Sequence, residues 1–392
     1  MIARAVTSRR DERIDFLRGL ALLIIFIDHV PKNIFEPYTL HAYAFADAAE
    51  VFFFISGFVA ALVYGRLMMQ QGFFAAARRV LRRALVVYAA QLLLLALILI
   101  EVSVFLLLNA DWNLIAPFRI SQFFEYPLEM VGQALILRFQ PAYLDILPSY
   151  VLLLAFFPLA LAGLARNVWY VLVPSFALWL SVQVFSLNLT ITIGEHWFFN
   201  PFAWQFLFVL GAVFGHPRLK GQMAFLDSRL LFWAAAALTG IIAVLQLSIV
   251  LYGINPAIPL LRTADLPLDK SSLQPLRIVS LLALALVVGR LLPPRGALLR
   301  YWPTLLVVWC GQSSLQVFCF GALLSSLTLL ASFLDGQNAW LQTALCVIGV
   351  GLQFVFAAYL QWARNGGRLL SLPASREVPV PVVERQRFDR RL

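Results

Sequence analysis

Arg18 and His29, two ionisable residues in the first apolar stretch of the chain, are the strongest candidates for chemistry. Ionisable groups are costly in such a stretch and need a reason to be there. An eleven-residue step along a helix turns three full circuits plus roughly 20°, so both side chains lie on one face, roughly 16 Å apart along the axis. A guanidinium suits phosphate groups, and an imidazole suits proton transfer near neutral pH. The alternative roles are an interfacial anchor for Arg18 and an interfacial hydrogen-bonding residue for His29.

Three acidic residues are candidate partners for His29. Asp28 precedes it directly, while Asp47 and Glu50 open the next apolar stretch and are expected at the same level as His29. A carboxylate beside an imidazole fixes its tautomer and stabilises the imidazolium that a general base becomes. Asp47 and Glu50 also suit the start of a helix, where negative side chains cap exposed N–H groups. The sequence leaves open which of the three acids serves His29.

The elements that position these residues are membrane helices. Of 392 residues, 61% are hydrophobic and only 13% are charged, and apolar stretches long enough to span a bilayer recur along the whole chain. They predict an all-α polytopic membrane protein with about ten transmembrane helices, at residues 15–35, 46–69, 79–108, 143–165, 167–188, 201–216, 229–252, 275–292, 303–333 and 338–362.

The domain organisation that follows is simple. A basic N-terminal segment (1–14) precedes one membrane domain (15–365), and a mobile cytoplasmic tail (366–392) alternates Pro, Val and charged residues. The first apolar stretch lacks a cleavage site of small residues, so it is expected to stay as a mature helix. Cys310, Cys319 and Cys346 have no metal-ligand spacing, so we expect neither a metal nor a bound cofactor.

The distribution of Lys and Arg predicts the orientation. With the N-terminus in the cytoplasm, 24 of the 30 basic residues fall on cytoplasmic segments and 6 fall outside. Both termini are therefore expected inside, with Arg18 near the cytoplasmic surface and His29 toward the outer one. The net charge of +10 is spread over the ends of hydrophobic helices, which favours contacts with anionic lipids and argues against nucleic acid.

Five stretches in a fixed order carry a family resemblance: RDERIDFLRGLALLIIFIDHVPKN (10–33), DAAEVFFFISGF (47–58), LDILPSY (144–150), FNPFAWQFLFVLG (199–211) and GQSSLQVF (311–318). With them the chain resembles the acyltransferase-3 superfamily and, more closely within it, the OpgC family of membrane succinyltransferases of osmoregulated periplasmic glucans. The resemblance implies an acyltransferase-3-like bundle of ten helices in the bacterial inner membrane, with both termini inside. It implies that His29 is the essential histidine, Arg18 the motif arginine and Glu50 the acid before FF-x-ISGF.

The reaction implied is acyl transfer from a cytoplasmic acyl-CoA, here succinyl-CoA as a co-substrate, to a hydroxyl of a periplasmic glucan. His29 would accept the hydroxyl proton, with Asp28, Asp47 or Glu50 in support. The CoA phosphates would lie at the cytoplasmic ends of the helices, near Arg18, Arg13, Arg82 and Arg83. Direct transfer is preferred over a covalent acyl-histidine or acyl-serine intermediate.

The acceptor is expected among outer residues that combine aromatic rings, carboxylates and amides, a composition that suits sugars. The candidates are Arg138, Asp145, Glu195, Trp197, Asn200 and Trp204, although single aromatic residues there also fit an interfacial belt. A succinyl carboxylate needs a nearby cation, for which Lys32 or Arg138 is available. The alternatives are an O-acetyltransferase acting on another envelope polysaccharide, a sugar or lipid transporter, which the absence of an internal repeat disfavours, and a non-catalytic membrane scaffold. The oligomeric state is not indicated.

Overall fold

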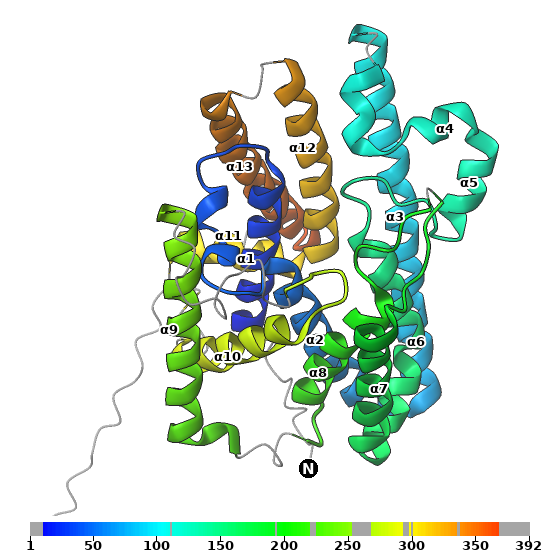
Figure 1. Cartoon of the computed structure of the whole chain (residues 1–392). Helices are drawn as coiled ribbons and strands as arrows, with labels where there is room; N and C mark the ends of the chain where they lie inside the picture. The colour runs from blue at the N-terminus through cyan, green and yellow to red at the C-terminus, as the bar shows by residue number, and fades with distance from the viewer. Residues whose placement is uncertain are drawn as a thin grey trace, which may run out of the picture.

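The computed structural model describes residues 11–109, 112–192, 194–219, 225–252, 268–292, 298, 301–334 and 338–367. These residues form a bundle of α-helices and short 3-10 turns, with no β-strand among them (Figure 1). Residues 1–10 of the expected N-terminal segment and 368–392 of the expected tail lie outside the described ranges. The helices are α1 (Glu12–His29), α2 (Ala48–Gln71), α3 (Phe73–Asn109), α4 (Ser121–Glu125), α5 (Pro127–Leu135), α6 (Ile146–Arg166), α7 (Trp169–Phe185), α8 (Pro201–Gly215), α9 (Arg229–Tyr252), α10 (Pro275–Leu291), α11 (Trp302–Gln312), α12 (Ser314–Leu334) and α13 (Ala339–Arg364).

Six of the described helices are long and apolar enough to cross a membrane: α2, α3, α6, α9, α12 and α13. The chain is therefore a polytopic helical membrane protein. The sequence predicts about ten crossings, and the length criterion supports six. Part of the difference is that α7 and α8 are apolar but have only 17 and 15 residues.

Helix α1 carries Arg18 and His29 and lies inside the bundle, packed against α2, α11, α12 and α13 (Figure 1). Its contact with α11 is so close that it needs glycines: a Cβ at Gly19 would collide with the Val307 carbonyl, and one at Gly311 would collide with the Asp15 carbonyl. Small residues allow membrane helices to approach in this way. The contact fixes the height and rotation of α1.

The end of α1 differs from the sequence prediction, which extended the helix to residue 35. The helix ends at His29, and Val30 is extended, with φ −85° and ψ 115°. Pro31 explains the early end, because a proline disfavours helical geometry in the residue before it. His29 therefore occupies the last turn of α1.

A second difference concerns residues 303–333, which the sequence predicts as one helix. The structure has two helices, α11 and α12, that meet at Ser313. At this interruption Arg18 donates a hydrogen bond from Nη2 to Ser314 Oγ, 2.6 Å away. Interrupted membrane helices often mark binding sites, because their ends expose polar backbone groups within the bundle.

Helix α3 has 37 residues and supports the segment that precedes α6. Gln91, buried in α3, donates from Nε2 to the Leu144 carbonyl at 3.0 Å. The sequence treats residues 109–142 as an outer loop, but this region contains a 3-10 segment (Trp112–Phe118), α4 and α5, which lie beside α3 (Figure 1).

Candidate active site

A cavity of about 610 Å³ lies at the end of α1 that carries His29. Its wall combines residues of α1, α2, α6 and α12 with residues of the segments between helices. Its ionisable lining residues are Asp28, His29, Glu36, His41, Asp47, Arg119, Tyr143, Asp145, His196 and Lys270. The structure therefore brings together residues that are more than 200 positions apart in the sequence.

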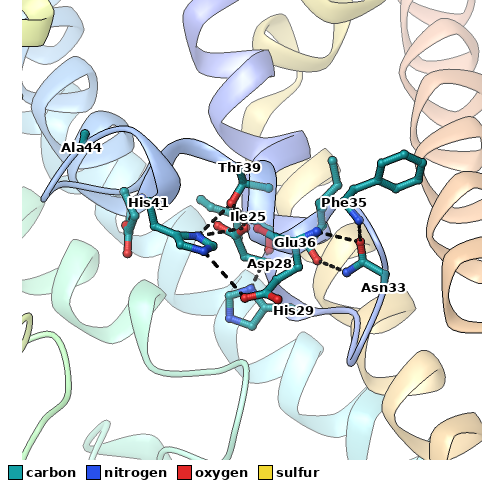
Figure 2. A network of polar contacts seen from close by, with 12 residues as sticks. Ile25, Asp28, His29, Asn33, Phe35, Glu36, Thr39, His41 and Ala44 are labelled. Atoms are coloured by element: carbon teal, nitrogen blue, oxygen red, sulfur yellow. Dashed lines mark hydrogen bonds and ion pairs between the residues drawn. The ribbon is translucent and has the colours of Figure 1, made fainter. Parts of the chain in front are cut away.

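The orientation of His29 is fixed by its own helix. Its Nδ1 lies 2.6 Å from the Ile25 carbonyl oxygen (Figure 2). A carbonyl only accepts hydrogen bonds, so Nδ1 carries the hydrogen and Nε2 of the neutral ring keeps its lone pair. The ring is exposed on the cavity side. This arrangement gives His29 the tautomer that a proton acceptor needs.

Asp28 is turned toward a different partner. Its Oδ1 accepts a hydrogen bond from Thr39 at 2.6 Å and lies 3.9 Å from His41 Nδ1, while His41 Nε2 lies 3.8 Å from Glu36 (Figure 2). The hydrogen bond of Asp28 is thus made with Thr39, while a supporting role of Asp28 for His29 stays a prediction. Sequence reasoning did not assign a role to His41, which joins this group through a short 3-10 turn (Leu40–Ala42).

Asp47 and Glu50 form a capping box at the start of α2, the structural alternative that the sequence left open. Asp47 Oδ1 accepts from the Ala49 N–H at 2.8 Å, and Glu50 Oε2 accepts from the Asp47 N–H at 3.1 Å. Both acids are also paired with distant cations: Lys270 Nζ lies 2.5 Å from Asp47, and Arg277 Nε donates to Glu50 at 2.6 Å. In the part of the chain that the structure describes, neither acid forms a hydrogen bond or an ion pair with His29.

In the cluster of Asp47, Glu50, Lys270 and Arg277, the mutual attraction of opposite charges keeps Asp47 and Lys270 ionised. Burial raises the pKa of Asp47, but the charges of Lys270 and Arg277 lower it by more than burial raises it, so the pKa lies well below the usual range. Burial lowers the pKa of Lys270, and the charges of Asp47 and Glu50 more than reverse this effect. Lys270 therefore stays cationic in the cavity wall.

The backbone that follows Lys270 is held by three side chains of the bundle. The carbonyls of residues 271–273 accept hydrogen bonds from Trp204 Nε1 at 3.2 Å, Gln183 Nε2 at 2.7 Å and Trp179 Nε1 at 2.9 Å. The ammonium of Lys270 also lies 5.5 Å and 5.6 Å from the centres of two phenylalanine rings. Such anchoring places this cation before any ligand arrives.

Asp145 lies in the cavity wall, at the residue before α6. The sequence leaves open whether it faces the cavity or caps the helix, and its carboxylate makes no capping hydrogen bond. Burial raises its pKa, and the charges of His29, Lys270 and Arg119 oppose that rise. Asp145 is thus a group of the cavity wall whose pKa is lowered by the charge of His29 against the effect of burial.

The expected acceptor-binding residues divide into two groups. Arg138 and Glu195 are exposed, and Glu195 forms an ion pair of 2.5 Å with Arg119, a residue of the cavity wall that was not among the candidates. Trp197, Asn200 and Trp204 are at most 3% exposed and belong to the core. They were expected to meet a sugar, but they stabilise the protein instead: Asn200 caps α8 and Trp204 holds the segment after Lys270.

A second cavity, of about 240 Å³, lies at the Arg18 end of α1. It is lined by Arg18, Arg83 and Arg364 together with the first turn of α12. The N-terminus of a helix carries partial positive charge and unsatisfied N–H groups. Of the other expected phosphate-binding residues, Arg13 pairs with Asp11 at 2.8 Å and Arg82 is exposed without lining the cavity. The second cavity is therefore a cationic site.

The two cavities lie about one helical turn apart on α1 and α6, and their linings adjoin on α12, where Val317 lines the first and Gln316 the second. Leu22 of α1 and Ile146 of α6 line the first cavity, and Arg18 and Tyr150 of the same helices line the second. Each step is four residues, which corresponds to roughly 6 Å along a helix. Three aromatic rings are in contact between them: Phe52 lies 5.9 Å from Tyr150 and 6.3 Å from Phe318, measured between ring centres. We call these three residues the aromatic partition.

The structure is a helical membrane bundle with a cavity that contains His29 at one end of α1 and a cationic cavity at the other. These features define the class as a membrane protein with a candidate catalytic centre. Residues 10–365 match the family model described as OpgC protein, and the chain belongs to this family of OpgC-type membrane acyltransferases of glucan modification. Comparisons with curated proteins and with solved structures give no match.

Proposed function

We propose that this protein transfers an acyl group, succinyl from succinyl-CoA, to a hydroxyl of a periplasmic glucan in the bacterial inner membrane. The observation that carries the proposal is the pair of cavities on opposite sides of the aromatic partition, one cationic and one containing His29. A donor and an acceptor that approach from opposite sides meet at such a partition without a mobile carrier. Both termini are on the cytoplasmic side in this proposal.

The donor binds in the cationic cavity. Arg18, Arg83 and Arg364 offer guanidinium groups to the CoA phosphates, and the first turn of α12 adds its partial positive charge. Arg18 and His29 are roughly 16 Å apart along α1, a distance comparable to the reach of an extended pantetheine arm. The side chains of the aromatic partition must move apart for that arm to bring the thioester to His29.

The transfer step uses the tautomer that the contact between His29 Nδ1 and the Ile25 carbonyl favours. His29 Nε2 takes the proton of the glucan hydroxyl as the hydroxyl oxygen attacks the thioester carbonyl. Collapse of the tetrahedral intermediate breaks the C–S bond, and the imidazolium returns the proton to the leaving CoA thiolate. The carboxylate of Asp145 stabilises the imidazolium, in line with the effect of the His29 charge on the pKa of Asp145. The products are the glucan ester and free CoA, with no acyl-enzyme.

The acyl group is proposed to carry a carboxylate because a preplaced cation lies in the cavity wall. Lys32 and Arg138, the cations considered from the sequence, are not among the residues that line the cavity, whereas Lys270 is. An ammonium has three N–H donors, and one faces Asp47. The remaining donors suit the free carboxylate of succinyl, while acetyl has no group for them.

The test is a vesicle assay with the purified full-length protein. Radiolabelled succinyl-CoA is supplied on the side of the Arg18 cavity, and an unmodified glucan on the side of His29. We expect labelled glucan only when both substrates are present, and no label on the protein after rapid quenching without glucan. Movement of glucan without acylation would contradict the enzyme assignment in favour of transport, and stoichiometric label on the protein would contradict direct transfer.

A further inference from the structure

Tyr143 faces His29 from the segment between α5 and α6. The centres of the two rings are 5.4 Å apart and their planes are tilted by 58°. On another side the Tyr143 ring meets Phe118, with 6.2 Å between ring centres. The Ile25 carbonyl holds His29 at Nδ1, and the Tyr143 ring packs against the imidazole in the wall of the same cavity.

The backbone of Tyr143 is strained. Its φ of 68° lies in the left-handed region, which is unfavourable for an L-residue with a bulky side chain. Strain of this kind persists only where the surroundings enforce it, and it concentrates at functional sites. The residue type is also unexpected, because glycine or asparagine would fit this conformation at lower cost.

The residues on both sides of Tyr143 are fixed by hydrogen bonds. The Ala142 N–H donates to the Phe118 carbonyl at 3.0 Å, and the Leu144 N–H donates to the Pro141 carbonyl at 3.1 Å. The Leu144 carbonyl accepts from the buried Gln91 side chain at 3.0 Å. The fold therefore holds an aromatic residue in a costly conformation directly beside the imidazole.

We propose that Tyr143 is a positioning residue for His29: its ring packs against the imidazole and keeps Nδ1 at the Ile25 carbonyl and Nε2 free for the substrate. The proposal rests on the proposed role of His29 as the base. The aromatic ring positions the imidazole, and the hydroxyl is not needed for this. The hydroxyl stays neutral because burial, with a smaller effect of the Glu101 charge, raises the pKa of Tyr143. A loose imidazole would sample orientations in which Nε2 does not meet the attacking hydroxyl.

Steady-state kinetics of three variants separate the ring from the hydroxyl. We expect Tyr143→Phe to keep a kcat close to that of the wild type, and Tyr143→Ala to lower kcat about 10- to 100-fold with KM unchanged, since small misplacements of catalytic groups have such effects. The control is Tyr126→Ala, because Tyr126 belongs to the same outer segment but is 60% exposed and does not line the cavity. A wild-type kcat in Tyr143→Ala, or a Tyr143→Phe variant as slow as Tyr143→Ala, would overturn the proposal.

A labelling measurement tests the same contact without turnover. Diethyl pyrocarbonate modifies imidazoles, and mass spectrometry of the intact folded protein gives the rate at His29 relative to His196, an exposed histidine that also lines the cavity. Tyr143→Ala is expected to raise this ratio and Tyr143→Phe to leave it unchanged. An unchanged ratio in Tyr143→Ala would contradict positioning. If instead His29→Ala retained transfer while the ratio rose as expected, the proposed function would fail and the contact would stand.

Discussion

Arg277 is predicted to be the most important cation for the stability of the α2–α10 contact. It pairs with Glu50, whose side chain is 0% exposed, while its own side chain is 11% exposed, and its Nη2 lies 3.5 Å from Asp47. Arg277→Met would leave a fully buried carboxylate without this partner, and breaking a buried pair in this way costs about 3–5 kcal/mol. The assay is thermal and denaturant-induced unfolding of the purified protein in detergent, followed by circular dichroism.

A matched control uses the other arginine–carboxylate pair near the cavity. Arg119 and Glu195 are 53% and 48% exposed, so Arg119→Met should cost at most about 1 kcal/mol. The double variant Arg277→Met/Glu50→Gln should recover most of the loss, because the buried charge is then removed as well. Equal destabilisation by Arg277→Met and Arg119→Met would refute the reasoning.

Three further predictions concern the cavity. Because burial raises the pKa of Asp145, its ionised form destabilises the fold, and Asp145→Asn should stabilise the protein at neutral pH while it slows transfer. The gain in stability should be absent below the unfolded pKa of about 3.9, grow as the pH rises toward the folded pKa, and stay constant above it. A gain that grows toward acidic pH in unfolding experiments would contradict this sign. Phe318→Trp should thicken the aromatic partition and slow turnover of succinyl-CoA, and a short succinyl thioester supplied on the His29 side should bypass the block; equal slowing of both donors would argue against a passage. Lys270→Met should lower the ratio of succinyl to acetyl transfer measured with mixed donors, and an unchanged ratio would assign Lys270 to structure alone.

The local features of this chain could be predicted from the sequence. Apolar stretches give the helices because burial and backbone hydrogen bonding act over consecutive residues. The placement of Arg18 and His29 on one face follows from helix geometry alone, and the structure opens a cavity at each end of that face. The capping role of Asp47 was also available from its position before an apolar stretch.

The partners of these residues could not be predicted, because they come from distant segments. Glu50 was expected beside His29, and it is Arg277, 227 positions away, that neutralises it. Lys270 shows no local signal as a site residue, since its position depends on side chains from α7 and α8 that hydrogen-bond to the backbone that follows it. The interruption at Ser313 was missed because no proline stands there, although Gly311, Gln312 and the two serines at 313–314 together are a weak signal of a break.

The central claim is that His29 is the base for transfer, and turnover of the reconstituted protein tests it most directly. The comparison is between His29→Gln and His196→Gln, with labelled glucan as the readout and thermal unfolding as the check on folding. We predict that His29→Gln lowers kcat about 100-fold or more with unfolding unchanged, and that His196→Gln keeps turnover close to that of the wild type. Wild-type turnover in the folded His29→Gln variant would contradict the mechanism.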